Sequence, residues 1–196
     1  PDTQLSPNLI LIRDTDITRA YQYSVTSYQQ PIFEPQLKYS RWQNLQLPEG
    51  VNPETREWAS ELYAQHSSNV EFIQAVLTRF NAQDYRYTLQ PPRYGRNGID
   101  EFMFDGRSGF CAHYASAFTF IMRSVGLPAR VVSGYQGGEW NPKGEYLSLF
   151  QYDAHAWSEV YLGERGWVRF DPTAFVAPER VETNLRQALS VQDLLL

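Results

Sequence analysis

Residues 106–136 read GRSGFCAHYASAFTFIMRSVGLPARVVSGYQ, and they carry the strongest structural signals in the chain. The first half of this stretch predicts a helix that ends near Gly126, because glycine caps helix ends and Pro128 cannot continue a helix. Apolar residues recur there at helical spacing, and a second stripe of small residues would let a sheet approach closely. We therefore expect this helix to lie buried in the centre of the domain. The β-branched residues 129–136, followed by Gly137 and Gly138, predict a strand directly after it.

The sequence around this stretch predicts helices before it and strands after it. Residues 146–150, 155–162 and 167–171 predict strands, and a short loop around Gly163 should join the last two as an antiparallel hairpin. Upstream, Asn52 followed by Pro53 is typical of a helix start. The apolar spacing that follows is interrupted at residues 67–69, which predicts two short helices or one kinked helix. Helices first and strands afterwards indicate an α+β fold.

The length of 196 residues predicts a single compact domain overall. Within it, residues 1–50 are interpreted as a β-rich N-terminal extension, because residues 19–30 alternate polar and apolar side chains like a strand with one buried face. Residues 51–196 are interpreted as the core, with a terminal helix over residues 184–196.

Charge and composition exclude several classes of function. Lys and Arg number 17 against 22 Asp and Glu, a net charge of −5, so no broad basic surface exists and nucleic acid is not an expected partner. No apolar run approaches the ~18 to 20 residues of a membrane span, and the first residues do not resemble a signal peptide. Because the chain begins at Pro1 rather than at methionine, we expect it to be part of a longer protein.

Cys111 is the single cysteine, so neither an internal disulfide nor a zinc site built on cysteine pairs is possible. It stands where the central helix begins, and the positive end of the helix dipole there favours the thiolate over the thiol. The backbone N–H of Cys111 could also donate to an oxyanion formed on a carbonyl that the sulfur attacks. The alternative is a buried cysteine that only packs, since free cysteine is among the most buried residue types.

His155 and Asp171 lie on the two strands of the predicted hairpin, and each faces the same side of its strand as the neighbouring aromatic residues. If the two residues are directly opposite, Tyr161 must pair with Arg165 across a three-residue turn, and the two Cβ atoms would lie ~5 Å apart. A carboxylate at that distance can orient the imidazole, which completes a set of nucleophile, base and orienting acid. Taken separately, each residue also has a structural interpretation, as a buried strand histidine and as a turn aspartate.

Together, three segments resemble the core of the transglutaminase-like family. They are the quoted stretch, DAHAWSEVYL at residues 153–162, and GWVRFDPT at residues 166–173. With YRYTLQPP at residues 85–92, the chain is most similar to bacterial inner-membrane proteins of the TgpA type, whose corresponding domain lies in the periplasm. The resemblance implies a papain-like fold, with the cysteine-bearing helix packed on an antiparallel sheet and residues 51–196 as the catalytic core. It also implies a periplasmic location and a membrane-anchored parent chain.

By this resemblance Cys111 is the nucleophile, His155 the base and Asp171 the residue that orients it. The implied reaction transfers a glutamine acyl group to a primary amine through a thioester, on a protein or peptide substrate. It needs no cofactor, and no counterpart of the animal enzymes' calcium sites is recognisable, so calcium independence is expected. Eukaryotic members of the family use an upstream tryptophan as the second oxyanion donor, but this chain has no tryptophan at a comparable place. Tyr87 is a candidate for that role, or else it is a core tyrosine.

Three further aromatic residues, Trp140, Tyr152 and Trp157, are candidates for substrate binding. Trp140 could line a substrate channel, or could equally be a loop residue that covers the core. Two other functions remain open. One is a cysteine peptidase or amidase acting on periplasmic or cell-wall peptides, and the other is a non-catalytic binding module that kept the fold.

Overall fold

The computed structural model describes residues 3–5, 11–20, 22–24, 26 and 41–182, and the chain divides into two units, residues 1–31 and 32–196. In the first unit, β1 (Thr3–Leu5) pairs with β2 (Leu11–Arg13) in an antiparallel arrangement. The strand predicted over residues 19–30 falls partly outside the described residues. Where described, at residues 19, 20, 22–24 and 26, the prediction is wrong: the backbone is irregular and the side chains are exposed, Tyr23 by 60%.

The second unit begins with a short 3₁₀ helix, η1 (Gln43–Leu45), and two helices, α1 (Pro53–Ala64) and α2 (Asn69–Ala82). The break predicted at residues 67–69 is confirmed. The Ser68 hydroxyl accepts from the Glu71 N–H at 3.2 Å, and the Glu71 carboxylate accepts from both the N–H and the hydroxyl of Ser67. This exchange satisfies N–H groups at the start of α2 that have no partner within the helix.

Asn52 does not cap the helix that it precedes, contrary to the expectation. Its backbone is left-handed (φ 51°), and its side-chain oxygen accepts from Ile99 and Asp100 at the start of α3 (Gly98–Asp100). In return, the Asp100 carboxylate accepts from the N–H groups of Glu54 and Thr55 at the start of α1. The two helices therefore cap each other. Neither α3 nor the π-helical segment η2 (Glu101–Gly106) carried a recognisable sequence signal.

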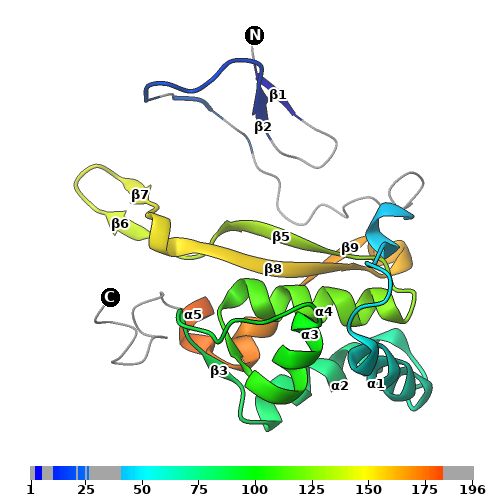
Figure 1. Ribbon diagram of the computed structural model, residues 1–196. Coiled ribbons are helices and arrows are strands. Elements are labelled where there is room, and N and C mark those ends of the chain that lie inside the picture. The colour runs from blue at the N-terminus through cyan, green and yellow to red at the C-terminus, as the bar shows by residue number, and fades with distance from the viewer. Residues whose placement is uncertain (1–2, 6–10, 21, 25, 27–40, 183–196) are drawn as a thin grey trace. The chain divides into compact units, whose positions relative to one another are not determined.

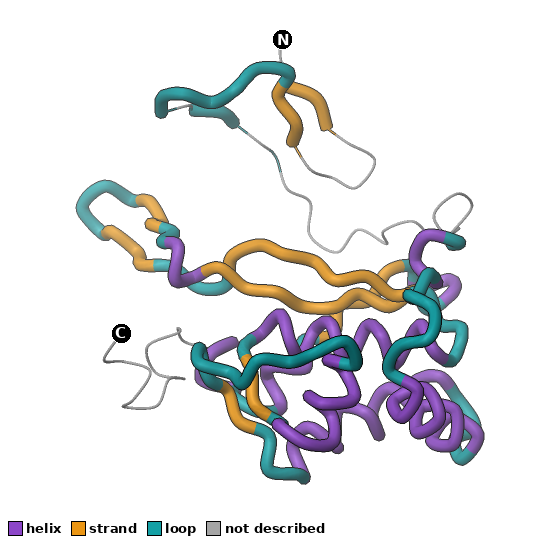
Figure 2. The backbone as a smooth tube through the Cα atoms, in the orientation of Figure 1, coloured by secondary structure: helices purple, strands orange, loops and turns teal. Residues whose placement is uncertain are grey.

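The central helix is α4 (Cys111–Ser124), and it ends before Gly126, whose φ of 81° requires a residue that tolerates the left-handed region. It packs on an antiparallel sheet ordered β5-β8-β9, formed by β5 (Ala129–Tyr135), β8 (Ala154–Tyr161) and β9 (Trp167–Phe170). Figure 1 shows α4 directly against the sheet, and Figure 2 shows the α-helices of this unit gathered on that side.

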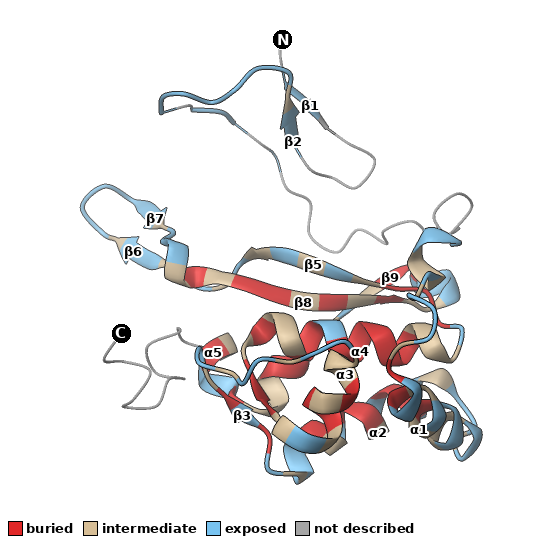
Figure 3. Cartoon of the chain, viewed as in Figure 1, coloured by how far each residue is buried: buried red, intermediate tan, exposed pale blue. Residues whose placement is uncertain are grey.

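Alternate residues of β8 face α4. The Ser158 hydroxyl donates to the Ala115 carbonyl at 3.0 Å and lies 3.0 Å from the Thr119 hydroxyl, both within the small-residue stripe of the helix. Buried residues concentrate on α4 and β8, as Figure 3 shows. The predicted α+β fold with a buried central helix is confirmed.

Smaller elements complete this unit. A parallel pair, β3 (Arg86–Tyr87) with β4 (Ser108–Gly109), leads into α4, and β6 (Glu139–Asn141) pairs with β7 (Tyr146–Ser148) in a hairpin. The remaining short helices are η3 (Gln151–Asp153), η4 (Gly163–Arg165), η5 (Pro172–Phe175) and α5 (Pro178–Glu182). The helix predicted over residues 184–196 lies outside the described residues, and a boundary at residue 50 stays a prediction.

The hairpin between β8 and β9 has a longer turn than expected. Tyr161 pairs with Trp167 rather than Arg165, so the turn holds five residues and includes η4. Gly163 and Gly166, with φ of 61° and 63°, provide its left-handed positions. The expected direct opposition of His155 and Asp171 is therefore wrong by two positions. Because side chains alternate with a period of two, both residues still face the same side of the sheet.

Candidate active site

Cys111 is the first residue of α4, and the β3–β4 pair fixes the backbone that leads into it. Tyr87 pairs with Gly109, and the Thr88 N–H donates to the Gly109 carbonyl at 2.9 Å. The cysteine is a free thiol, 9% exposed. The predicted position at a helix start is confirmed, so the sulfur lies where the first N–H groups of a helix have no intrahelical acceptor.

His155 and Asp171 are joined by a hydrogen bond of 2.7 Å between Nε2 and Oδ2. Since a carboxylate only accepts, Nε2 carries the proton. Nδ1 is buried and has no nitrogen or oxygen partner within the described part of the chain, so it is the ring atom available to the thiol. Asp171 is itself held by the Thr173 N–H at 3.2 Å and by Arg169 Nη2 at 3.2 Å.

The surroundings shift the three pKa values in the directions that favour a thiolate and an imidazolium. Burial opposes ionisation of the Cys111 thiol, but hydrogen bonds with the His155 side chain and the Ala156 backbone outweigh it and lower its pKa. Burial also opposes the charged form of His155, yet hydrogen bonds with Asp171 and Cys111 raise its pKa. Burial would raise the pKa of Asp171, whereas hydrogen bonding to His155 and Arg169 holds it below its ordinary value.

Trp157 supports the His155–Asp171 pair. Its ring stacks on the imidazole with centroids 6.3 Å apart, and the Arg169 guanidinium lies 4.3 Å above the indole. Gly134 of β5 makes room for this ring, because a Cβ at Gly134 would come within 2.8 Å of it. The cavity beside Cys111 is not lined by Trp157, so substrate binding by this residue stays a prediction.

A cavity of about 320 Å³ opens at the thiol, and eight residues line it: Tyr87, Leu89, Phe110, Cys111, Gln151, Tyr152, Ala154 and His155. The structure therefore brings two sequence candidates, Tyr87 and Tyr152, to the same cavity as the nucleophile and the base. The Tyr152 hydroxyl donates to Glu139 at 2.9 Å. Trp140 lies on β6, is 61% exposed and does not line this cavity.

The Tyr87 hydroxyl lies beside the reacting atoms. Burial and the neighbouring Cys111 raise its pKa to about 12, whereas Arg180 and a hydrogen bond with the Cys111 backbone lower it. Tyr87 is therefore a neutral O–H donor at neutral pH, next to the N–H group that the sequence analysis assigned to an oxyanion.

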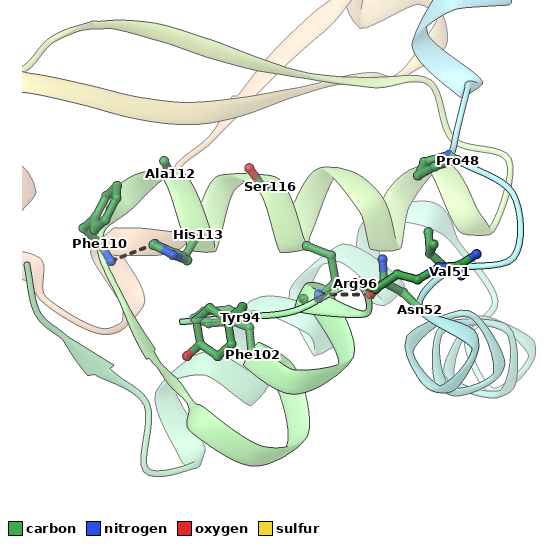
Figure 4. Close-up of a pocket in the computed structure, with 12 residues that line it drawn as sticks. Pro48, Val51, Asn52, Tyr94, Arg96, Phe102, Phe110, Ala112, His113 and Ser116 are labelled. Atoms are coloured by element: carbon green, nitrogen blue, oxygen red, sulfur yellow. Dashed lines mark hydrogen bonds between the residues drawn. The ribbon is translucent and has the colours of Figure 1, made fainter. Parts of the chain in front are cut away.

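A larger cavity of about 630 Å³ runs along α4, with Phe110 and His113 at one end of it, as Figure 4 shows. It does not contain Cys111. His113 faces it, but its Nδ1 accepts from the Phe110 N–H at 3.3 Å and its ring packs against Phe110 and Tyr94. Burial lowers the pKa of His113, which makes it a neutral packing residue rather than a second base.

Two findings concern the described residues as a whole. No group of three or more His, Cys, Asp or Glu side chains among them is arranged to hold a metal ion. None of their helices is both long enough and apolar enough to cross a membrane.

Arg180 of α5 is a site residue that the sequence analysis missed. It is 1% exposed, and its Nη2 donates to the carbonyl of Ala154 in the cavity wall at 2.6 Å. No sequence signal could have found it, because nothing in the residues around an arginine of a short helix distinguishes a buried side chain from the usual exposed one.

Comparison with known proteins places this geometry in a family. The transglutaminase-like superfamily matches residues 56–172. A protein-glutamine gamma-glutamyltransferase of Pseudomonas aeruginosa strain PAO1 is 48% identical over 190 residues, which is 96% of this chain and 28% of that protein. The uncharacterised protein YebA of Bacillus subtilis is 32% identical over 136 residues, 66% of this chain and 18% of that protein. The chain thus spans less than a third of the length of either relative.

Two solved structures agree with the fold. The periplasmic domain of P. aeruginosa TgpA superposes with a TM-score of 0.92 at 49% identity, covering 96% of this chain and 66% of that one. The same domain bound to ethylmercury gives a TM-score of 0.89 at 48% identity, covering 93% and 66%. The resemblance to TgpA-type periplasmic domains and the papain-like fold are confirmed.

Proposed function

Because the chain belongs to the transglutaminase-like superfamily, we propose that it transfers the acyl group of a glutamine side chain to a primary amine through Cys111. The observation that supports this most is the protonation pattern of the His155 ring. Asp171 accepts from Nε2, and Nδ1 is left for the thiol at the start of α4.

The first half of the reaction forms a thioester. The Cys111 thiolate attacks the carboxamide carbon, and the resulting oxyanion lies against the backbone N–H at the helix start. The His155 imidazolium then gives its proton to the departing nitrogen, the C–N bond breaks and ammonia leaves. Asp171 stabilises the imidazolium before this transfer and keeps the ring oriented after it.

The second half releases the product. A primary amine attacks the thioester carbonyl, and neutral His155 takes a proton from the amine nitrogen through Nδ1. The C–S bond breaks, an amide forms and the thiolate–imidazolium pair returns. Water in place of the amine gives a free carboxylate, so the same groups also support deamidation.

Tyr87 is our candidate for the second oxyanion donor. Tyr87 and Cys111 line the same cavity, and a neutral hydroxyl close to the Cys111 backbone N–H could donate to an oxyanion bound there. Removing one such donor costs on the order of 10²- to 10³-fold in turnover.

The substrate class follows from the family and from the relatives. The P. aeruginosa relative is a protein-glutamine gamma-glutamyltransferase, which supports a protein or peptide substrate with a glutamine donor. The P. aeruginosa domain that the chain resembles is periplasmic, which supports a periplasmic location in a membrane-anchored parent protein. Calcium independence stays our expectation.

The test is an amine-incorporation assay without calcium. The chain and its Cys111→Ala variant are incubated with a glutamine-rich protein and a labelled primary amine, and the protein is read by intact mass. Cys111-dependent addition of the amine with loss of ammonia supports acyl transfer. Cleavage or deamidation alone would make the site a hydrolase, and identical spectra in both samples would favour a binding module.

A further inference from the structure

Arg180 is a buried cation that the mechanism above does not use. Its Nη2 donates to the Ala154 carbonyl, but Nε and Nη1 are buried without a hydrogen-bond partner among the described residues. No carboxylate in that part of the chain forms an ion pair with it. Besides the Ala154 carbonyl, the guanidinium interacts with the neutral Tyr87 hydroxyl, so its positive charge is held inside the protein without an anionic partner among the described residues.

Such an arrangement is costly, because removing an ion from water costs several kcal/mol unless an opposite charge is nearby. An anion that forms in the site would offset that cost. Ala154, to which Arg180 donates, lines the same cavity as Cys111 and Tyr87. Of these two, Tyr87 stays protonated at neutral pH, which leaves the thiolate as the anion.

The fold fastens Arg180 in this position. Figure 1 shows α5 at the N-terminal end of α4, where the cysteine lies. The Gln136 side chain donates to the Val181 carbonyl at 2.9 Å and accepts from Arg169, which also contacts Asp171. One glutamine thus ties the helix that carries Arg180 to the residues that hold the aspartate of the site.

We propose that Arg180 is a positioning residue that supplies the fixed counter-charge of the Cys111 thiolate from behind the cavity. The sulfur loses its negative charge when the thioester forms and regains it when the thioester breaks. A buried cation beside it stabilises the thiolate as resting nucleophile and as leaving group. This inference rests on the proposed role of Cys111 as nucleophile.

Three elements place titratable or charged groups close to the thiol, and Tyr152 of η3 lines the same cavity with its hydroxyl bonded to Glu139. His155 faces the thiol from β8, Tyr87 from β3 and Arg180 from α5, whereas Asp171 acts through the His155 ring. A test must therefore separate the charge of Arg180 from that of the imidazole and from a structural contribution.

The experiment measures the rate of Cys111 alkylation by iodoacetamide against pH in two substituted chains. Arg180→Gln removes the charge but retains a donor for the Ala154 carbonyl, and Arg180→Lys retains the charge. We expect Arg180→Gln to shift the pH profile upward and to slow alkylation at neutral pH about tenfold. Arg180→Lys should keep most of the rate. In Arg180→Gln, the rate of alkylation by the negatively charged reagent iodoacetate should fall more than the rate of alkylation by iodoacetamide.

Arg123→Gln is the matched control, because Arg123 also donates to a backbone carbonyl, that of Ala129 at 2.7 Å, but at the far end of α4. It should leave the alkylation profile unchanged. Superimposable profiles for Arg180→Gln and the unsubstituted chain would overturn the inference, and so would equal losses in the Gln and Lys variants. If Arg180→Gln does not fold, Arg180→Lys is sufficient for the test. An upward shift of the pH profile of alkylation in the folded Lys variant would then contradict the inference. Alkylation needs no substrate, so amine incorporation can still succeed or fail independently.

Discussion

At the scale of single residues, the protonation state of His155 determines what the site can do. The Asp171 carboxylate fixes the proton on Nε2, which leaves Nδ1 as the ring nitrogen available to the Cys111 thiol. If Nδ1 carried the proton instead, this nitrogen could not accept the proton of the Cys111 thiol, although the three residue types would be the same. The geometry thus supports a nucleophile and base in a way that the residue types alone do not.

Asp171→Asn should lower amine incorporation by about 10²- to 10⁴-fold. The imidazolium loses its charged partner, and no carboxylate then keeps the proton of the neutral ring on Nε2. The thiol should remain open to alkylation at high pH. Asp100→Asn is the control, since Asp100 is also buried but caps α1, and it should lower stability by about 1 kcal/mol without changing activity per folded molecule. Unchanged activity in Asp171→Asn would remove this residue from the site.

The two shifted pKa values predict the pH dependence of acylation. The thiol ionises below its ordinary pKa, so the rate should rise with pH through that lowered value. The imidazolium persists above its ordinary pKa, so the rate of acylation should fall only as pH passes that raised value. A bell-shaped profile in single-turnover measurements is the expected outcome. A rate that rises continuously to alkaline pH would contradict the ion pair.

Tyr87→Phe should reduce turnover on the order of 10²-fold while leaving the alkylation rate of Cys111 nearly unchanged, because the hydroxyl acts on the oxyanion and not on the sulfur. Tyr85→Phe is the matched control. Its hydroxyl donates to the Met103 carbonyl at 2.8 Å in the core, so stability should fall but turnover per folded molecule should not. Equal turnover in both variants would leave Tyr87 as a core tyrosine.

At the scale of elements, the site depends on how β5 and β8 approach each other. Gly134 lies opposite His155 in the ladder, and the Trp157 ring occupies the space where a side chain would be. That ring in turn stacks on His155, and the Arg169 guanidinium lies over its face. Because Gly134 on β5 has no Cβ, the Trp157 ring on β8 fits beside it and packs against the His155 imidazole.

Gly134→Ala should displace the Trp157 ring, disturb the His155–Asp171 pair and lower amine incorporation at least tenfold, because the new Cβ would come within 2.8 Å of the indole. Trp157→Leu alone should also lower activity, because the ring no longer stacks on His155, and adding Gly134→Ala to it should cost little more, because the steric contact is then absent. Activity of Gly134→Ala equal to that of the unsubstituted chain would show that the ring has room to move.

The helix that begins at Cys111, the strand that holds His155 and the strand that ends just before Asp171 could be predicted, because each has a strong local pattern. The hairpin turn was predicted two residues too short, since η4 is built from ordinary residues and a longer turn preserves the same alternation. The mutual capping of α1 and α3 joins residues more than 40 positions apart, which no local pattern reports. His155 and Asp171 nevertheless lie on the same face of the sheet, as predicted, because the turn is longer by two residues and an even shift preserves the alternation of side chains.

At the scale of the whole molecule, the described residues of the site span Tyr87 to Arg180, within the second unit. The family match ends at residue 172, and Arg180 lies beyond it. The nucleophile, base and acid could be recognised from motifs, whereas Arg180 and the cavity wall depend on how distant segments meet. Burial of a charge is a property of the folded chain, so its partner could be found only from the structure.

The most direct test of the central claim is to trap the thioester on Cys111. The chain is mixed with a glutamine-containing peptide in the absence of amine, quenched in acid and measured by intact mass, with Cys111→Ala beside it. We expect an adduct equal in mass to the peptide less one ammonia, on Cys111 alone, that hydroxylamine removes. Turnover of the peptide without such an adduct, or the same adduct in Cys111→Ala, would contradict this claim.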